Sequence, residues 1–359
     1  MEESIYVIAP HARMTLWGDQ PLKDRLFGGF NLPLVELLAT PVRPQDLQFV
    51  QTPPRQRRQS NDAPTFCDLP IEIHLLIFDQ FEFIEDVVRL GLASQYFWTL
   101  ARSRLHDYHM SFLGPWAGKN IVCVGARVKP DDYPPGLFSA EELDILRPLR
   151  ANVLLRDGSY EVVHRDQPFA LSHFAEPYIS QVGRDVLISH EEWKRRVIFN
   201  RKSRHASRNS EFVPRKWDIE STYYPRDQPW ILRNLTTKEF VRAEAIAMKP
   251  EYINGPNISI VGFGEVVLAR TCWSSSPSNV LINNTTGPPR GAWAGHRLDI
   301  TTLANHESGV DTVGWSDVSD EVAKEMAEIW REEFKVDIRE DLADWNSRRL
   351  NAIHHPIPP

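Results

Sequence analysis

Three residues in the second half of the chain have the chemical types of a catalytic nucleophile, a base and an orienting group. They are Cys272, His296 and Asp299, whose side chains could in principle assemble for covalent catalysis. No local signature places them together, and His296 and Asp299 flank an ordinary strand pattern. The sequence therefore predicts structural roles for all three and no catalytic residue.

A pair of glycines, Gly262 and Gly264, follows an apolar run in the manner of a dinucleotide-binding loop. Such a loop needs a third glycine and a helix N-terminus that holds the pyrophosphate. The residues after Gly264 are instead typical of a continuing strand, so we predict a hairpin of residues 257–262 and 264–270. Walker-type loops and the HExxH and GxSxG motifs are absent from the sequence. We expect a protein that is not an enzyme and holds no cofactor.

Three cysteines, Cys67, Cys123 and Cys272, lie far apart in the sequence and form no CxxC pair. This spacing argues against a disulfide framework and a structural zinc site, so no metal site is predicted. The first residues lack the basic and apolar regions of a signal peptide, and no apolar run approaches the length of a membrane span. We expect a protein of the cytoplasm, the nucleus or both, without membrane contact.

The strongest charge feature is a basic stretch at residues 194–216, whose single acidic residue is Glu211. Aromatic side chains alternate with the basic ones, as in segments that bind nucleic acid. The candidate residues for an acidic or phosphorylated partner are Arg195, Arg196, Arg201, Lys202, Arg204 and Arg208. Residues 317–345 hold eleven acids against four bases and could neutralise this stretch within the molecule. The chain's net charge of −7 also argues against general polyanion binding, so nucleic acid stays an alternative partner.

A length of 359 residues predicts two or three domains. We expect an N-terminal strap or tail at 1–40, a Pro/Arg-rich linker at 41–64, a helical bundle at 65–112, a larger domain at 113–345 and a C-terminal tail at 346–359. The linker is assigned because its polar, proline-rich composition cannot bury enough surface to order itself.

Residues 65–112 carry the pattern of three short helices. The first is expected to start after a capping Asp68 and to run to about Phe81, and Ser94 is well placed to cap the third. The first helix has two apolar stripes, one of Ile73, Leu76 and Ile77 and the other of Ile71, Leu75 and Phe78. A surface helix needs only one stripe, so something beyond the three helices must cover the second.

The order of residues in this segment resembles the F-box. The resemblance is carried by Leu69, Pro70, Glu72 and Ile73, then Ile77 and Phe78, then Glu85, Asp86, Val87, Val88 and Leu90, and finally Leu92, Ala93, Ser94 and Phe97. Residues 114–125, 133–138 and 230–246 also look like a group of filamentous-fungal F-box proteins without a known activity. The resemblance implies a small orthogonal helix bundle that docks on the Skp adaptor subunit of Skp–cullin–F-box ubiquitin ligases.

The resemblance also implies how the protein would act in the ubiquitin-conjugation pathway. The expected contacts with the Skp subunit are Leu69, Pro70, Ile73, Leu76, Ile77, Val87 and Leu90. Through that subunit the chain would reach a cullin, and residues 113–345 would recruit an unknown protein substrate. The alternative is a purely structural bundle, packed on residues 113–345, in a protein that binds nucleic acid or an acidic partner through residues 194–216.

Residues after Gly114 are typical of a β-rich domain. The sequence predicts a buried strand at 121–125, hairpins of 153–155 with 160–163 and of 230–235 with 240–245, and a strand at 297–301 with one exposed face. Ser139 opens a capping-box helix, and a long acidic helix begins at Ser319. The predicted fold class is α+β, with an N-terminal three-helix F-box-like bundle followed by a larger β-rich α+β domain that has a C-terminal helix.

Overall fold

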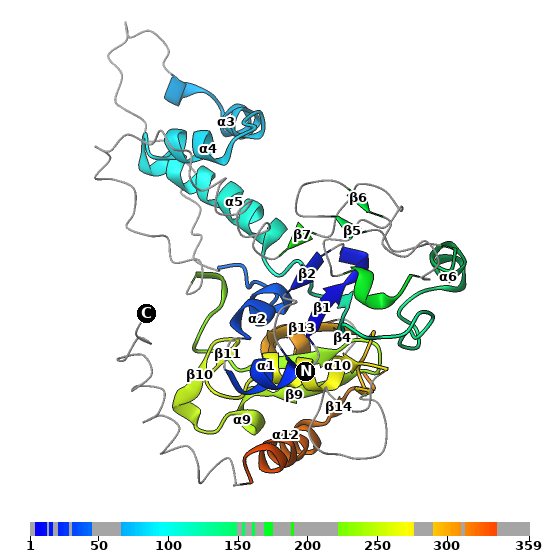
Figure 1. Ribbon diagram of the computed structural model, residues 1–359. Helices are drawn as coiled ribbons and strands as arrows, with labels where there is room; N and C mark the ends of the chain where they lie inside the picture. Colours follow the sequence, from blue (N-terminus) through cyan, green and yellow to red (C-terminus); the bar gives the residue numbers. More distant parts are fainter. Residues whose placement is uncertain are drawn as a thin grey trace, which may run out of the picture. The chain divides into compact units, whose positions relative to one another are not determined.

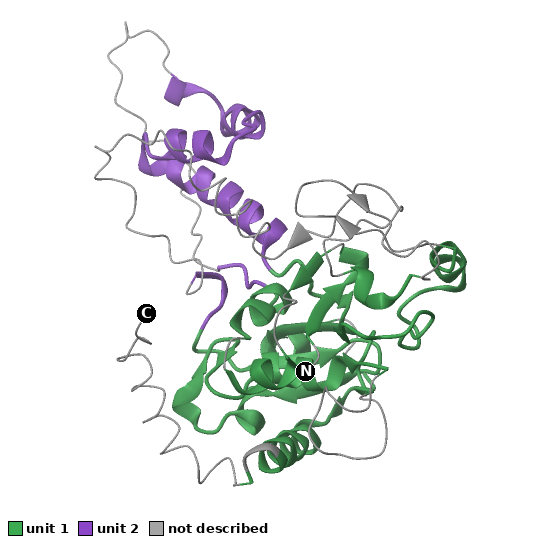
Figure 2. Cartoon of the chain, in the orientation of Figure 1, with its two compact units in different colours: residues 1–40, 114–191, 226–359 green, residues 41–113, 192–225 purple. Residues whose placement is uncertain are grey.

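The computed structural model describes residues 4–12, 14–16, 21–28, 31–44, 66–148, 153–154, 160–161, 169–174, 188–189, 222–275, 290–309 and 313–335. Within these residues the chain is an α+β protein of helices and mixed sheets (Figure 1). The chain forms two compact units, which Figure 2 distinguishes by colour. Unit 1 takes in residues 1–40, 114–191 and 226–359, and unit 2 takes in residues 41–113 and 192–225.

Residues 66–113 of unit 2 form three helices in succession. They are α3 (Ile71–Asp79), α4 (Ile84–Gly91) and α5 (Gln95–Phe112), preceded by the short 3-10 helix η2 (Phe66–Asp68). The Ser94 side chain accepts a hydrogen bond from the Phe97 N–H, which confirms the predicted cap of the third helix. The predicted cap of the first helix is wrong, because Asp68 lies within η2 and Pro70 takes the N-cap position without a side-chain bond.

The three helices of unit 2 share one apolar core. Its buried residues are Phe78, Val87, Tyr96, Phe97, Leu100, Ala101 and Leu105. At Gly91, the last residue of α4, an added Cβ would lie 2.6 Å from the Cβ of Ala101 on α5. The missing side chain of Gly91 therefore lets α4 and α5 approach closely.

Unit 1 contains two five-stranded sheets, of which the first has the order β12-β4-β1-β2-β7. Its strands are β12 (Cys272–Trp273), β4 (Val122–Gly125), β1 (Ile5–Ala9), β2 (Met14–Leu16) and β7 (Ile188–Ser189). Strand β4 confirms the buried strand predicted at 121–125. The central β1 pairs antiparallel with β2 and β4. The sequence predicts either a strap or a tail at residues 1–40. Besides β1 and β2, this segment forms α1 (Leu22–Gly28) and α2 (Leu32–Leu38).

The second sheet of unit 1 has the order β14-β9-β8-β13-β3. Its strands are β14 (Ser316–Asp317), β9 (Glu239–Arg242), β8 (Trp230–Asn234), β13 (Arg297–Thr302) and β3 (Lys119–Asn120). The antiparallel pair β8–β9 confirms the predicted hairpin, although the short helix α9 (Ala243–Ile246) replaces its last residues. The exposed face predicted for β13 is wrong, because only Arg297 is exposed and α2 and α11 (Leu303–Glu307) contact the strand.

The hairpin predicted for residues 257–270 is wrong. Residues 263–271 form a helix, α10 (Phe263–Thr271), in which every residue is buried, and only β11 (Asn257–Ile258) is extended, paired with β10 (Ile253–Asn254). A short apolar run does not distinguish a buried strand from a buried helix. The helix begins between the two glycines, with Gly262 at its N-cap and Gly264 in its first turn. The Glu265 carboxyl group accepts the Gly262 N–H, and Asn31 packs against Gly264. The first turn of this helix is therefore already capped by Glu265, a side chain of the same chain.

The acidic helix predicted from Ser319 is confirmed as α12 (Ser319–Phe334). Its buried residues on one face include Val322, Met326 and Trp330. The buried Arg270 of α10 pairs with Glu321 and Glu325, which fixes α12 against α10. The predicted hairpin of β5 (Val153–Leu154) with β6 (Tyr160–Glu161) is also confirmed. The remaining short elements are η1 (Pro10–Ala12), α6 (Ala140–Leu146), η3 (Leu171–Phe174) and η4 (Pro250–Tyr252).

Candidate interaction surface on the helical bundle

Helix α3 is apolar on two faces, as its sequence predicts. Ile71, Leu75 and Phe78 pack into the core of the bundle. On the other face Ile73 is 39 % exposed and Leu76 is 56 % exposed. The helices of the bundle therefore cover one stripe and leave the other at the surface.

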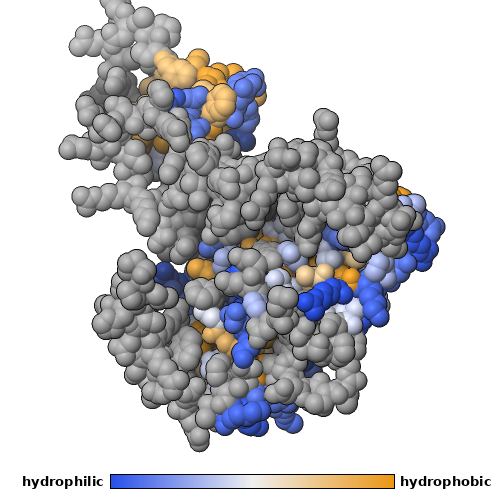
Figure 3. All heavy atoms as spheres, viewed as in Figure 1, coloured by the Kyte–Doolittle hydropathy of each residue, from blue (hydrophilic) through white to orange (hydrophobic). Residues whose placement is uncertain are grey.

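Further apolar side chains of unit 2 are exposed near the ends of α3 and α4. They are Phe66 in η2, Phe83 before α4 and Leu92 after it. Figure 3 shows apolar surface on the described part of the bundle, bordered by hydrophilic side chains. Single exposed apolar residues are ordinary, but a group of them on one small unit makes this bundle a candidate interaction surface.

The residues predicted to contact the Skp subunit divide between surface and core. Besides the two exposed α3 residues, Pro70 is exposed, and Leu69, Ile77 and Leu90 are half-buried. Val87 is only 4 % exposed and packs inside the bundle. The side chain of Val87 is therefore not available to a partner while the bundle keeps this fold, and the candidate surface is centred on α3.

Helix α3 also contains a buried polar residue that the sequence analysis did not single out. The Nε2 atom of His74 lies 2.9 Å from the Phe66 carbonyl oxygen, and its Nδ1 lies 3.0 Å from the Tyr96 hydroxyl oxygen. The carbonyl can only accept, so Nε2 donates to it, and a neutral ring then accepts from the hydroxyl at Nδ1. Burial raises the pKa of Tyr96, and the nearby Glu72 and Cys67 add to the effect. His74 thus ties η2 and α5 to α3 and fixes how α3 presents its outer face.

The C-terminal half of α5 is engaged by two other segments of unit 2. His106 Nδ1 lies 2.8 Å from the Tyr223 hydroxyl oxygen, and the Val42 N–H donates to the Tyr223 carbonyl at 2.8 Å. Arg43 also donates to Asp107 on α5. Burial raises the pKa of Tyr223 well above its ordinary value. These contacts cover α5 toward its end, whereas the outer stripe of α3 has no comparable cover among the described residues of unit 2.

The three residues of the candidate catalytic set have separate structural partners. Cys272 lies fully buried in β12, beside β4. The Asn234 amide nitrogen lies 2.9 Å from Nδ1 of His296. Asp299 accepts two hydrogen bonds from Arg233, of 2.8 and 2.7 Å. Each side chain thus has a different neighbour in the fold.

Two cysteines that are distant in the sequence are neighbours in the first sheet of unit 1. Cys123 and Cys272 are Cα partners across the parallel pair β4–β12, and both are buried free thiols. A hydrogen bond with Cys272 and burial raise the pKa of Cys123. No group of three or more residues suited to a metal ion occurs in the part of the chain that the structure describes.

The predicted basic patch cannot be located in the fold. Arg195, Arg196, Arg201, Lys202, Arg204 and Arg208 all lie outside the described residues. Their role stays a prediction from sequence. Among the helices of the described segments, none is both long and apolar enough to cross a membrane.

We compared the chain with protein-family models, with curated proteins and with solved structures, and found no match in any of the three comparisons.

Proposed function

We propose that the protein is a non-enzymatic substrate adaptor of a Skp–cullin–F-box ubiquitin ligase. In this proposal unit 2 is an F-box-like bundle that binds the Skp adaptor subunit and, through it, a cullin. Unit 1 recruits a target protein for ubiquitination. The protein would act in the cytoplasm, the nucleus or both.

The observation that carries the proposal is the exposed outer stripe of α3. Ile71, Leu75 and Phe78 serve the bundle's own core, so Ile73 and Leu76 are left available for a partner. Full burial of one such side chain contributes about 1.5–3 kcal/mol. Since both side chains are already partly covered, each would contribute roughly 1–2 kcal/mol on docking.

The identity of the partner comes from the F-box resemblance. The motif residues Leu69, Pro70 and Ile73 stand at the start of α3, and two of them, Pro70 and Ile73, are exposed. The start of the segment that resembles an F-box and the apolar stripe that the bundle leaves exposed therefore fall together at α3. Val87, which belongs to the same motif, supports the bundle from inside its core.

Co-purification of the full chain with a recombinant Skp adaptor subunit tests the proposal. Ile73→Asp and Leu76→Asp each place a charge where the complex would bury an apolar side chain, so each should weaken binding about 100-fold, or ~3 kcal/mol. The matched control is Val313→Asp, which puts the same charge at an exposed apolar position of unit 1 and should leave binding unchanged.

Far-UV circular dichroism of each variant checks that the helices persist, which is expected because both α3 positions are exposed. The proposal is rejected if the wild-type chain fails to bind the adaptor subunit. It is also rejected if folded Ile73→Asp and Val313→Asp variants recover equal amounts of it.

A further inference from the structure

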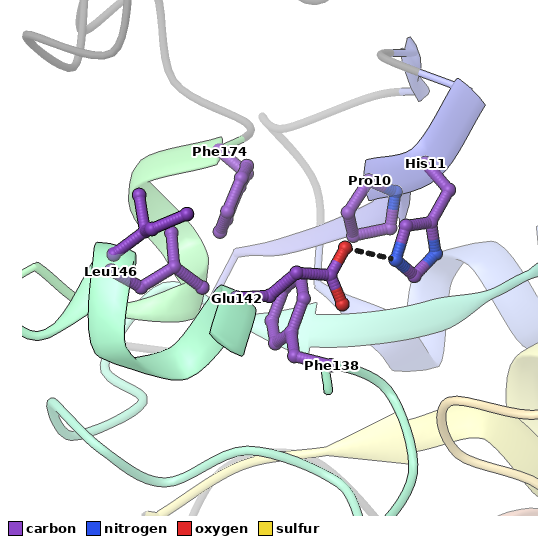
Figure 4. A pocket seen from close by; sticks show the side chains of 7 residues that line it. Pro10, His11, Phe138, Glu142, Leu146 and Phe174 are labelled. Atoms are coloured by element: carbon purple, nitrogen blue, oxygen red, sulfur yellow. Dashed lines mark hydrogen bonds and ion pairs between the residues drawn. The ribbon is translucent and has the colours of Figure 1, made fainter. Parts of the chain in front are cut away.

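A shallow pocket of about 160 Å³ opens on unit 1, away from any residue assigned a role above. It is lined mainly by Pro10, His11, Phe138, Glu142, Ile145 and Phe174, which come from η1, α6, η3 and the loop before α6. Figure 4 shows Phe138 and Phe174 facing the hollow, with the carboxyl group of Glu142 turned toward His11. A cavity of about 150 Å³ admits one benzene molecule. The pocket therefore has room for one aromatic or branched aliphatic side chain.

The aromatic walls of the pocket are held by the core of unit 1. The rings of Phe138 and Phe174 stack with centroids 5.7 Å apart and an angle of 22° between their planes. Both rings pack against a buried cluster that includes Val124, Leu137 and Leu171. The walls are thus preorganised, which lowers the entropy cost of accepting a ligand.

The polar edge of the pocket is also fixed before any ligand arrives. Glu142 accepts the Ser139 N–H at 2.7 Å with one carboxylate oxygen and lies 3.1 Å from His11 Nε2 with the other. The hydrogen bond from Ser139 and the nearby His11 lower the pKa of Glu142, so this carboxylate is charged at neutral pH. Glu142 therefore places a negative charge at the edge of an apolar hollow.

Of the other charged residues of α6, Glu141 adds to this negative charge, whereas Asp144 does not. Asp144 pairs with Arg147 at 3.0 Å, so these two charges offset each other. Glu141 is exposed and its pKa is lowered by backbone hydrogen bonding at the start of α6. At the rim Ile145 is 59 % exposed, an apolar side chain that nothing in the described part of unit 1 covers.

We propose that this pocket is a peptide-binding site that takes one phenylalanine- or leucine-sized side chain from a basic segment of a target protein. The side chain would lie in the pocket against the exposed edges of the stacked Phe138 and Phe174 rings and cover Ile145. A lysine or arginine beside it would face Glu141 and Glu142. The inference deepens the proposed function, on which it rests for its biological use, because an adaptor needs a site for its target.

Fluorescence anisotropy of the full chain with labelled peptides tests the site. The probe is Ser-Gly-Lys-Lys-Phe-Lys-Arg-Gly-Ser, compared with one peptide in which alanine replaces phenylalanine and one in which glutamate replaces the four basic residues. Both changes should weaken binding at least about tenfold, the second more strongly at low salt. Equal binding of the phenylalanine and alanine peptides would overturn the proposal.

Matched variants of the chain locate the binding. Ile145→Glu should weaken binding of the phenylalanine peptide at least about tenfold. Val313→Glu, at an exposed apolar position outside the pocket, should leave binding unchanged. Glu141→Lys should weaken it several-fold, and Glu244→Lys, on the exposed side of α9, should not. Equal effects of Ile145→Glu and Val313→Glu would show that the peptide binds elsewhere.

The same protein samples are tested for the Skp subunit, so the two proposals fail separately. If the chain binds the Skp subunit but no peptide, the peptide-binding proposal is rejected and the proposed function stands. If the chain binds the peptide through Ile145 but does not bind the Skp subunit, the pocket stands as a peptide site and the ligase role is rejected.

Discussion

Glu265 is a carboxyl group inside unit 1, where the Asn31 amide donates to it at 2.7 Å and the Gly262 N–H donates to it at 2.8 Å. Burial raises its pKa to about 7, against the opposing effect of these hydrogen bonds. In the unfolded chain the group returns to its ordinary pKa of about 4.5. Between these values the folded state keeps a proton that the unfolded state has released, so stability falls as pH rises.

Replacing Glu265 by glutamine should remove this part of the pH dependence. The wild-type free energy of unfolding should fall relative to that of Glu265→Gln by about 2–4 kcal/mol between roughly pH 4.5 and 7, and the difference should level off above pH 7. Urea denaturation at several pH values, followed by the fluorescence of the buried tryptophans, measures both curves. Parallel curves would show that Glu265 titrates normally in the folded protein.

At the scale of single residues, the sequence predicts the interactions that close within a few positions. Ser94 caps α5 and Ser139 forms its capping box as predicted, because donor and acceptor are three residues apart. Glu265 and Asn31 are 234 positions apart, and no local pattern joins them. His74 was missed for the same reason, since its Tyr96 partner belongs to another helix.

Among the elements, α4 and α5 depend on the absence of a side chain at Gly91. Gly91→Ala improves helix propensity by up to about 1 kcal/mol but drives a backbone-tied methyl into Ala101, which costs about 1–3 kcal/mol. We expect a net loss of roughly 1–2 kcal/mol of stability. Chemical denaturation followed by far-UV circular dichroism measures it.

A compensating variant separates this clash from other effects. Ala101→Gly restores the space on α5, so the double variant Gly91→Ala/Ala101→Gly should be more stable than the sum of the two single changes predicts. Simple additivity would mean that Gly91 is present for another reason. Hydrogen exchange over residues 84–112 assigns the effect to these two helices.

Some helices and strands can be predicted from the sequence pattern alone, and others cannot. The three helices of unit 2, the β8–β9 hairpin and α12 follow from spacing and turn signals. The strand predicted at residues 264–270 is wrong. Val266 and Val267 favour strands in isolation, but complete burial and a carboxyl-capped N-terminus stabilise the helix α10. Strand β1 pairs with β4 across more than a hundred residues, which periodicity in a single segment cannot show.

At the scale of the whole molecule, the two proposed sites belong to different compact units. The outer stripe of α3 lies in unit 2, and the pocket beside α6 lies in unit 1. Their proposed roles are complementary, since an adaptor must bind the ligase and the target through separate surfaces. Composition and sequence pattern predicted the α+β class and the candidate surface of α3. The pocket could not be predicted, because its walls come together only when η1 meets α6 and η3.

If the sites are separate, one chain should bind the Skp subunit and the basic peptide at the same time. Saturating amounts of the Skp subunit should change the Kd of the peptide by no more than about twofold, because the two sites share no residue and belong to different compact units. Peptide anisotropy with and without the Skp subunit measures this, with Ile73→Asp as the control that removes only the Skp subunit. A tenfold change in Kd, equal to about 1.4 kcal/mol of coupling, would mean that binding at one unit alters the other.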